Sequence, residues 1–94
     1  MFNVKMVDPG KIVLSGRFDA SQVEKAKGIF NKINSTCTVD FNDLEYISSA
    51  GLGVLLLTQK RLSESGNGLK LTNINKHIRD VFRYAGFDKI FKIE

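Results

Sequence analysis

Two adjacent serines followed by a glycine-rich segment are the residues of this chain whose types and spacing could do chemistry. Ser48 and Ser49 stand between a short apolar run, residues 38–41, and a long apolar helical pattern, residues 54–62. They are therefore expected at a helix N-terminus, where unpaired backbone N–H groups and the helix dipole favour negative charge. A phosphate would be stabilised there. Serine is also a common helix cap, and on position alone the cap is the more frequent role.

Motifs of the common enzyme classes are missing from the sequence. Ser49 does not stand in a Gly-x-Ser-x-Gly elbow, and the only histidine, His77, belongs to a different predicted helix. No P-loop is present, and residues 51–53 lack the third glycine of a dinucleotide motif. Cys37 is the only cysteine, so neither an internal disulfide nor a cysteine metal cluster can form. We therefore expect a binding module that is not an enzyme and that holds no cofactor and no metal.

The elements that must position the serines alternate between strands and helices. Their apolar spacing predicts, in chain order, strands at 2–6 and 11–15, a helix at about 20–33, a strand at 37–41, a helix at about 50–65, a strand at 69–71, a helix between Asn73 or Asn75 and Gly86, and a short strand or tail at 87–93. This order, β-β-α-β-α-β-α-β, indicates an α/β fold. We expect one domain over residues 1–94, with a mixed, mostly parallel sheet packed with helices.

Three local details belong to this prediction. Asp19 stands three residues before Gln22, which is the spacing of a capping box. Residues 42–45 are predicted as a turn. The second helix carries a second apolar stripe, Ala50, Val54 and Leu57, beside its core-facing leucines. A neighbouring helix or a partner protein must cover that stripe, and the sequence leaves both alternatives open.

Net charge and hydropathy limit which partners and which cellular location are expected for the chain. The net charge is +4, and all of it comes from residues 60–94, which hold eight basic and four acidic residues. These charges are dispersed and no nucleic-acid motif accompanies them, so no direct contact with nucleic acid is expected. No apolar run is long enough to span a membrane, and the first residues lack the pattern of a signal peptide. The expected location is cytoplasmic, and the free protein is expected to be a monomer.

Five motifs in order resemble the STAS domain, and within it the bacterial anti-sigma factor antagonists. Gly16–Asp19 looks like the family's Gly-x-Leu-Asp, and Val39–Leu44 is similar to its Val-x-Leu-x-x-Leu strand. Tyr46–Leu55 looks like the signature Phe-x-Asp-Ser-Ser-Gly-Leu-Gly-x-Leu. Gly68–Leu71 and Tyr84–Phe87 also fit the pattern. The resemblance covers nearly the whole chain.

Two departures from the family pattern lie inside the signature. Ser48 stands where the family has an aspartate, and Ala50 stands where it has a second serine. Ala50 removes one competing acceptor hydroxyl, while Ser48 supplies another. The basic C-terminal third also differs from the acidic character that is usual in these antagonists.

The resemblance implies a phosphorylation switch in transcription regulation by partner switching. By position Ser49 matches the phosphoacceptor, with Ser48 as the fallback, and Asp19 matches the family aspartate near it. The implied partners are a GHKL-type serine kinase that is also an anti-sigma factor, whose capture releases a sigma factor, and a PP2C-type phosphatase. The expected partner-binding residues are Asp19, Ser48, Ser49, Ala50, Gly51, Leu52, Gly53, Val54 and Leu57. The alternative is a STAS subunit held constitutively in a larger membrane-associated assembly, such as a lipid-transport ABC complex.

Overall fold

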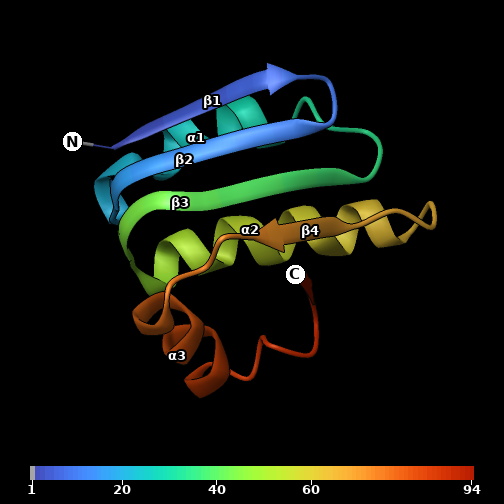
Figure 1. The fold of residues 1–94 in the computed structure, drawn as a ribbon. Helices are drawn as coiled ribbons and strands as arrows, with labels where there is room; N and C mark the ends of the chain where they lie inside the picture. The colour runs from blue at the N-terminus through green and yellow to red at the C-terminus, as the bar shows by residue number, and fades with distance from the viewer. Residues whose placement is uncertain (1) are drawn as a thin grey trace.

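A computed structural model describes residues 2–94 and shows a five-stranded sheet with two helices on one face (Figure 1). The strands are β1 (Asn3–Asp8), β2 (Lys11–Phe18), β3 (Cys37–Ile47), β4 (Leu69–Thr72) and β5 (Lys92–Ile93). They lie in the sheet in chain order; β1 and β2 form an antiparallel hairpin, and every later pair is parallel. The predicted mixed, mostly parallel sheet is confirmed.

Helices make each of the parallel crossovers. After a short 3₁₀ turn, η1 (Ala20–Gln22), they are α1 (Val23–Phe30), α2 (Ser49–Ser63) and α3 (Lys76–Tyr84). In Figure 1, α1 and α2 lie behind the sheet, and α3 lies at one end of it. The other face of the sheet carries no helix in this view. Within residues 2–94, no helix is both long and apolar enough to cross a lipid bilayer.

The core lies between the sheet and the helices. Along β2 the side chains of Ile12, Leu14 and Phe18 are completely buried, whereas Val13, Ser15 and Arg17 face the open side of the sheet. From α2, Leu55 and Leu62 reach the same core. Burying each such side chain contributes roughly 1.5–3 kcal/mol. This packing fixes α2 against the sheet, and with it the position of the serines at its start.

The third strand differs from the prediction. β3 runs over 11 residues, so the predicted turn at residues 42–45 is wrong. The pairing of β3 with β2 shifts register twice, and each shift leaves one extra residue on β3. Asp40 pairs with Val13 but Asp43 pairs with Ser15, and the second shift follows Leu44. Such bulges interrupt the alternation of apolar side chains without ending the strand. The sequence pattern therefore resembled a turn.

The first helix is shorter than predicted, and its N-terminal cap has another form. Asp19 caps η1 by accepting a hydrogen bond from the backbone N–H of Ser21 at 3.0 Å, while Gln22 makes no capping bond, so the capping box is wrong. At the other end the guanidinium of Arg61 donates to the carbonyls of Phe30 at 3.0 Å and Ile33 at 2.7 Å. A side chain from α2 thus satisfies carbonyls where α1 ends.

Candidate functional site

The serines and Asp19 meet at the edge of the sheet where β2 and β3 both end. Phe18 and Ile47 are neighbours in the parallel register, and the backbone N–H of Ser48 donates to the carbonyl of Phe18 at 2.9 Å. The two chains therefore leave the sheet together, one into η1 and the other into α2. In α/β sheets this carboxyl edge is the usual place for binding sites.

Ser48 is the N-cap of α2. Its backbone is extended, and its hydroxyl oxygen accepts a hydrogen bond from the backbone N–H of Gly51 at 3.1 Å. Its carbonyl accepts the first bond of the helix, from Leu52 at 2.9 Å. The Ser48 side chain is half-buried and its oxygen already has a structural partner.

Ser49 is the first residue of α2 and is exposed. Within residues 2–94, no hydrogen bond involves its hydroxyl group, in contrast to that of Ser48. The Ser49 hydroxyl is therefore accessible from solvent, next to the positive end of the helix dipole. Of the two serines, Ser49 can be modified without removing the cap.

Asp19 places a carboxylate on the same edge. It is half-exposed, and one of its oxygens accepts hydrogen bonds from the backbone N–H and the hydroxyl of Ser21. η1, which Asp19 caps, contacts α2. This negative charge therefore lies beside the start of α2 and would oppose a second negative charge there.

The two glycines after the serines have different environments. Gly51 is buried, and a Cβ atom at this position would stand 2.9 Å from Ile47 Cγ1 and 3.1 Å from Phe18 Cγ. Glycine here allows α2 to approach the ends of β2 and β3 closely. At Gly53, which is partly exposed, such a Cβ would meet no atom within 4 Å among residues 2–94 outside its own stretch of α2.

The second apolar stripe of α2 is covered only in part. Val54 is 4% exposed, whereas Leu57 is 61% exposed and Ala50 is also exposed. A groove of about 220 Å³ runs between α1 and α2 and is lined by Lys27, Asn31, Val54, Leu57, Thr58 and Arg61. Val54 is thus buried beside α1, whereas Leu57 remains exposed.

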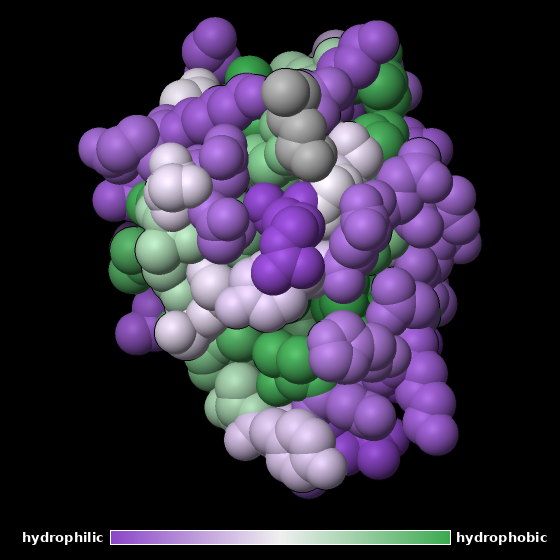
Figure 2. Space-filling view, turned by 90° about the vertical axis from the view of Figure 1, so that its left-hand side faces the viewer, coloured by the Kyte–Doolittle hydropathy of each residue, from purple (hydrophilic) through white to green (hydrophobic). Residues whose placement is uncertain are grey.

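The nine residues predicted to bind a partner fall into two sets. Ser49, Ala50 and Leu57 are exposed, and Asp19, Ser48 and Gly53 are partly exposed. Five of these six residues lie at or near the start of α2, and Leu57 lies about two turns further along the helix. Gly51, Leu52 and Val54 are buried and form the second set. In Figure 2, which views this end of the molecule, a pale and green area lies in the lower middle, below a strongly hydrophilic residue at the centre, and purple residues border it on the right.

Sequence reasoning did not single out one pair at this edge. Arg17 and Tyr46 are register partners on β2 and β3, and the Arg17 guanidinium carbon lies 4.4 Å from the centre of the Tyr46 ring. Both project from the open face of the sheet, one residue before the ends of their strands. Only the bulge in β3 brings them opposite each other, so no signal in the sequence could have paired them. Within residues 2–94, no group of three or more His, Cys, Asp or Glu side chains could hold a metal ion.

Comparison with known proteins identifies a family and named relatives. The family model described as "Mlab, STAS domain" matches residues 4–93. The chain is 38% identical over 74 residues to the Bordetella bronchiseptica protein named "Putative anti-sigma factor antagonist BtrV"; the match covers 79% of the chain and 58% of BtrV. It is 26% identical over 85 residues to a STAS-domain containing protein of Pseudomonas aeruginosa, covering 87% of the chain and 84% of that protein. The chain thus spans less than two thirds of BtrV.

Solved structures share the fold. The anti-sigma factor antagonist SpoIIAA in its unphosphorylated form superimposes with a TM-score of 0.79 at 22% identity, over 100% of the chain and 88% of SpoIIAA. The Bacillus cell fate determinant SpoIIAA in the phosphorylated form gives a TM-score of 0.67 at 24% identity, over 100% of the chain and 91% of that structure. At these identities the likeness concerns the fold alone.

Proposed function

The chain belongs to the STAS domain family, and we propose that it is an anti-sigma factor antagonist whose binding is switched off by phosphorylation of Ser49. The name of BtrV, its relative at 38% identity, supports the antagonist role. SpoIIAA, which shares the fold, exists in phosphorylated and unphosphorylated forms, and this supports a phosphate-based switch. In this proposal the chain binds the anti-sigma factor, and the partner's kinase activity transfers the phosphate to Ser49.

The observation that carries the proposal is the contrast between the two serines. The Ser48 oxygen caps α2 through the N–H of Gly51, whereas Ser49 is exposed with its hydroxyl unengaged within residues 2–94. A kinase that phosphorylates the Ser49 hydroxyl leaves the Ser48 cap of α2 intact. Phosphorylation of Ser48 would instead modify the oxygen that accepts the capping hydrogen bond from Gly51. Ser49 is therefore the acceptor we propose.

Phosphate on Ser49 would act by electrostatics. It brings about −1.5 to −2 charges and lies at the helix N-terminus, where the free protein stabilises it. In the complex that charge must leave water, beside the carboxylate of Asp19, which costs several kcal/mol. A loss of about 3–5 kcal/mol weakens binding by roughly two to four powers of ten. One phosphate is therefore enough to separate two partners.

The proposed docking surface extends along α2 from the serine. It consists of Ser49, Ala50, Gly53 and Leu57, with Asp19 at its edge. Leu57 supplies exposed apolar area, and Gly53, which has no side chain and no contact with other described segments at its Cβ position, lets a partner approach the helix backbone. The partner we propose is an anti-sigma factor with GHKL-type serine kinase activity, and a PP2C-type phosphatase would reverse the modification.

The test pairs the purified chain with each GHKL-type serine kinase encoded in the source genome. Isothermal calorimetry measures binding, and mass spectrometry after incubation with ATP locates the phosphate. We expect Ser49→Ala to bind and to accept no phosphate, Ser49→Asp to bind at least about a hundredfold more weakly, and the matched control Ser48→Ala to be phosphorylated at Ser49. If Ser49→Asp bound the kinase with the same affinity as the unmodified chain, the proposed switch would be refuted.

A second candidate function is a STAS subunit held constitutively in a larger membrane-associated assembly. The observation in its favour is the positive charge of residues 60–94, since anionic membrane surfaces attract basic proteins. In that case the chain co-purifies with an ATPase and a permease, carries no phosphate, and keeps its partner when Ser49→Asp is introduced. The two candidates thus give opposite results with the same variant.

A further inference from the structure

An exposed arginine lies at the same end of the sheet as Ser49 but outside the docking surface proposed above. Arg17 is the last residue but one of β2, and its guanidinium carbon lies 4.4 Å from the centre of the Tyr46 ring. A cation over the face of an aromatic ring is attracted by the electrons of the ring. This contact limits the conformations of the Arg17 side chain, although the residue is exposed to solvent.

The backbone on both strands is shaped to form this pair. Gly16, directly before Arg17, has a φ of 81°, a conformation that glycine adopts without strain. On β3 the second register shift skips Glu45, so that Arg17 pairs with Tyr46. Bulges of this kind re-aim side chains and are frequent next to functional sites. The local irregularity therefore places the ring of Tyr46 beside the guanidinium group.

No carboxylate of the described chain neutralises the charge of Arg17. Within residues 2–94 the ion pairs are Lys11 with Asp40 and Lys27 with Glu24. A guanidinium group carries five N–H donors in a planar fork, which matches the two oxygens of a carboxylate. Arg17 can therefore offer this fork to a carboxylate from outside the chain.

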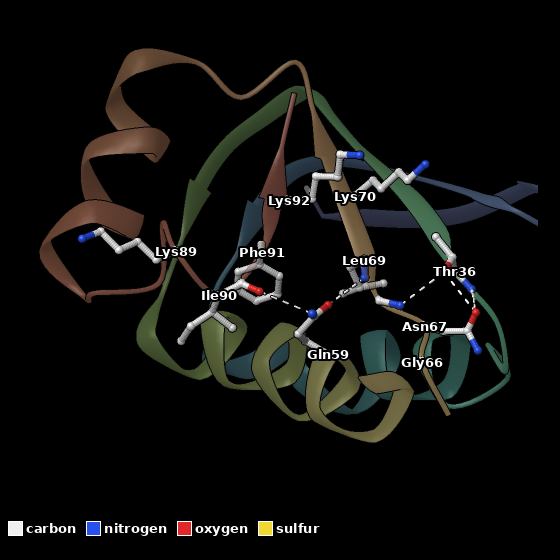
Figure 3. A pocket seen from close by; sticks show the side chains of 11 residues that line it. Thr36, Gln59, Gly66, Asn67, Leu69, Lys70, Lys89, Ile90, Phe91 and Lys92 are labelled. Carbon is white, nitrogen blue, oxygen red and sulfur yellow. Dashed lines mark hydrogen bonds between the residues drawn. The ribbon is translucent and has the colours of Figure 1, made fainter. Parts of the chain in front are cut away.

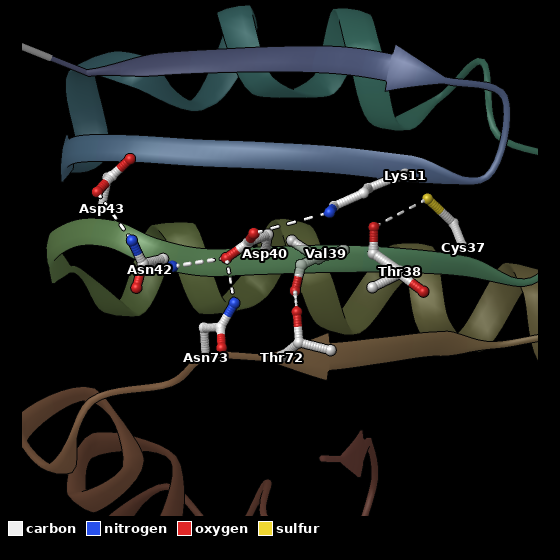
Figure 4. Close-up of polar contacts among 9 residues, drawn as sticks. All are labelled: Lys11, Cys37, Thr38, Val39, Asp40, Asn42, Asp43, Thr72 and Asn73. Carbon is white, nitrogen blue, oxygen red and sulfur yellow. Dashed lines mark hydrogen bonds and ion pairs between the residues drawn. The ribbon is translucent and has the colours of Figure 1, made fainter.

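Two acidic side chains on β3 already have partners of their own (Figure 4). Asp40 accepts hydrogen bonds from the backbone N–H of Asn42 at 2.8 Å and from the side-chain amide of Asn73 at 3.1 Å. Asp43 accepts a hydrogen bond from the side-chain amide of Asn42 at 3.2 Å. These contacts hold both carboxylates along β3, so they do not compete for Arg17.

Arg17 and Ser49 lie close enough together for one partner to cover both. Tyr46 and Ser49 are three residues apart in the chain, so their Cα atoms are at most roughly 11 Å apart. Neighbouring strands place the Cα atom of Arg17 about 5 Å from that of Tyr46. A standard interface covers about 800 Å² on each partner, an area roughly 30 Å across. A partner centred near Ser49 thus extends over Arg17.

We propose that Arg17, held against Tyr46, is an anchor that binds a carboxylate of the anti-sigma factor. This inference rests on the proposed function, because it needs that partner. Arginine and tyrosine are enriched among the interface residues that carry most of the binding energy. The partner's surface opposite Arg17 is acidic, and this charge helps the chain to select its own kinase among related ones.

The test measures, by calorimetry, the binding of Arg17 variants to the GHKL-type kinase that binds the unchanged chain. We expect Arg17→Met to bind about tenfold more weakly or worse. Arg17→Lys keeps the charge but loses the fork, so its affinity should lie between those of Arg17→Met and the unchanged chain. Tyr46→Leu should weaken binding severalfold, because the arginine loses the ring that holds it.

Lys92→Met is the matched control. Lys92 is exposed and is the register partner of Lys70, next to which it stands in Figure 3. Through Thr38 this register leads to Lys11, at the start of β2 and thus at the opposite end of the sheet from Arg17. The control removes one positive charge far from Ser49 and should bind the kinase as the unchanged chain does.

A double-mutant cycle identifies the carboxylate. Each exposed Asp or Glu of the kinase is changed in turn to Asn or Gln, and one such change should weaken binding of the unchanged chain but not of Arg17→Met. The anchor is overturned if Arg17→Met and Lys92→Met bind alike, or if no acidic residue of the kinase couples to Arg17; weak binding of Ser49→Asp would then still support the switch. If no kinase binds the unchanged chain, the proposed function fails and the anchor fails with it.

Discussion

Alanine at Gly51 and at Gly53 tests whether the start of α2 is packed as closely as the structure indicates. Both glycines lie in the same helix, two residues apart, so each substitution gains about the same helix propensity, roughly 1 kcal/mol. The two variants then differ only in what the new methyl group meets. Gly53→Ala is the matched control for Gly51→Ala.

The new methyl group meets very different surroundings at the two positions. At residue 51 its Cβ would be 2.9 Å from Ile47 Cγ1 and 3.1–3.2 Å from two ring atoms of Phe18. Ile47 is 3% exposed and Phe18 is 0% exposed, so neither can move into solvent. Overpacking of this kind typically costs about 1–3 kcal/mol. At residue 53 no atom of the described chain outside the neighbouring helix backbone lies within 4 Å of the new Cβ, so only the gain in helix propensity remains.

Urea denaturation followed by far-ultraviolet circular dichroism gives the free energy of unfolding of each variant. We expect Gly53→Ala to be more stable than the unchanged chain by about 0.5–1 kcal/mol, and Gly51→Ala to be less stable than Gly53→Ala by about 1–3 kcal/mol. For a domain of this size the second difference corresponds to a melting temperature lower by roughly 5–20 °C. Equal stability of the two variants would refute the close approach of α2 to Phe18 and Ile47.

Three further predictions concern stability and reactivity. Arg61→Met should lower the free energy of unfolding by about 1–2 kcal/mol, because the Arg61 guanidinium donates to the carbonyl of Phe30, the last residue of α1, and to that of Ile33 just beyond it. Lys60→Met, one residue earlier, should change the free energy of unfolding little, and equal effects of the two variants in urea denaturation would contradict this role. Asn75→Ala should cost about 1 kcal/mol by removing the N-cap of α3, with Asn75→Asp retaining most of the stability; an unchanged midpoint for the alanine variant would contradict the cap. Burial raises the pKa of the Cys37 thiol above its ordinary value of 9.0, so folding favours the protonated form and its stabilisation is lost as pH rises above that value. A disulfide reagent should therefore react slowly with native Cys37 and quickly in urea, and equal rates would show that the thiol is not protected.

Local patterns of apolar residues determined most of the fold in advance. The hairpin, the alternation of strands and helices and the position of Ser49 at the start of α2 all follow from periodicities of two and 3.6 residues. Gly86 also ends α3 with a positive φ of 76°, as its position after the last apolar residue predicts. These features depend on residues close together in the chain, which is why the sequence contains them.

Other features depend on contacts between distant segments, and only the tertiary structure decided them. The bulges of β3 arise from its register with β2, and α1 ends where Arg61 of α2 reaches its carbonyls. Whether Val54 or Leu57 is free depends on where α1 lies against α2, which no local pattern contains. For the two serines the resemblance already favours Ser49 as the acceptor over Ser48. What the tertiary structure adds is the setting: the backbone N–H of Ser48 donates to the carbonyl of Phe18 on the neighbouring strand, the Ser48 hydroxyl caps α2, and Ser49 is exposed.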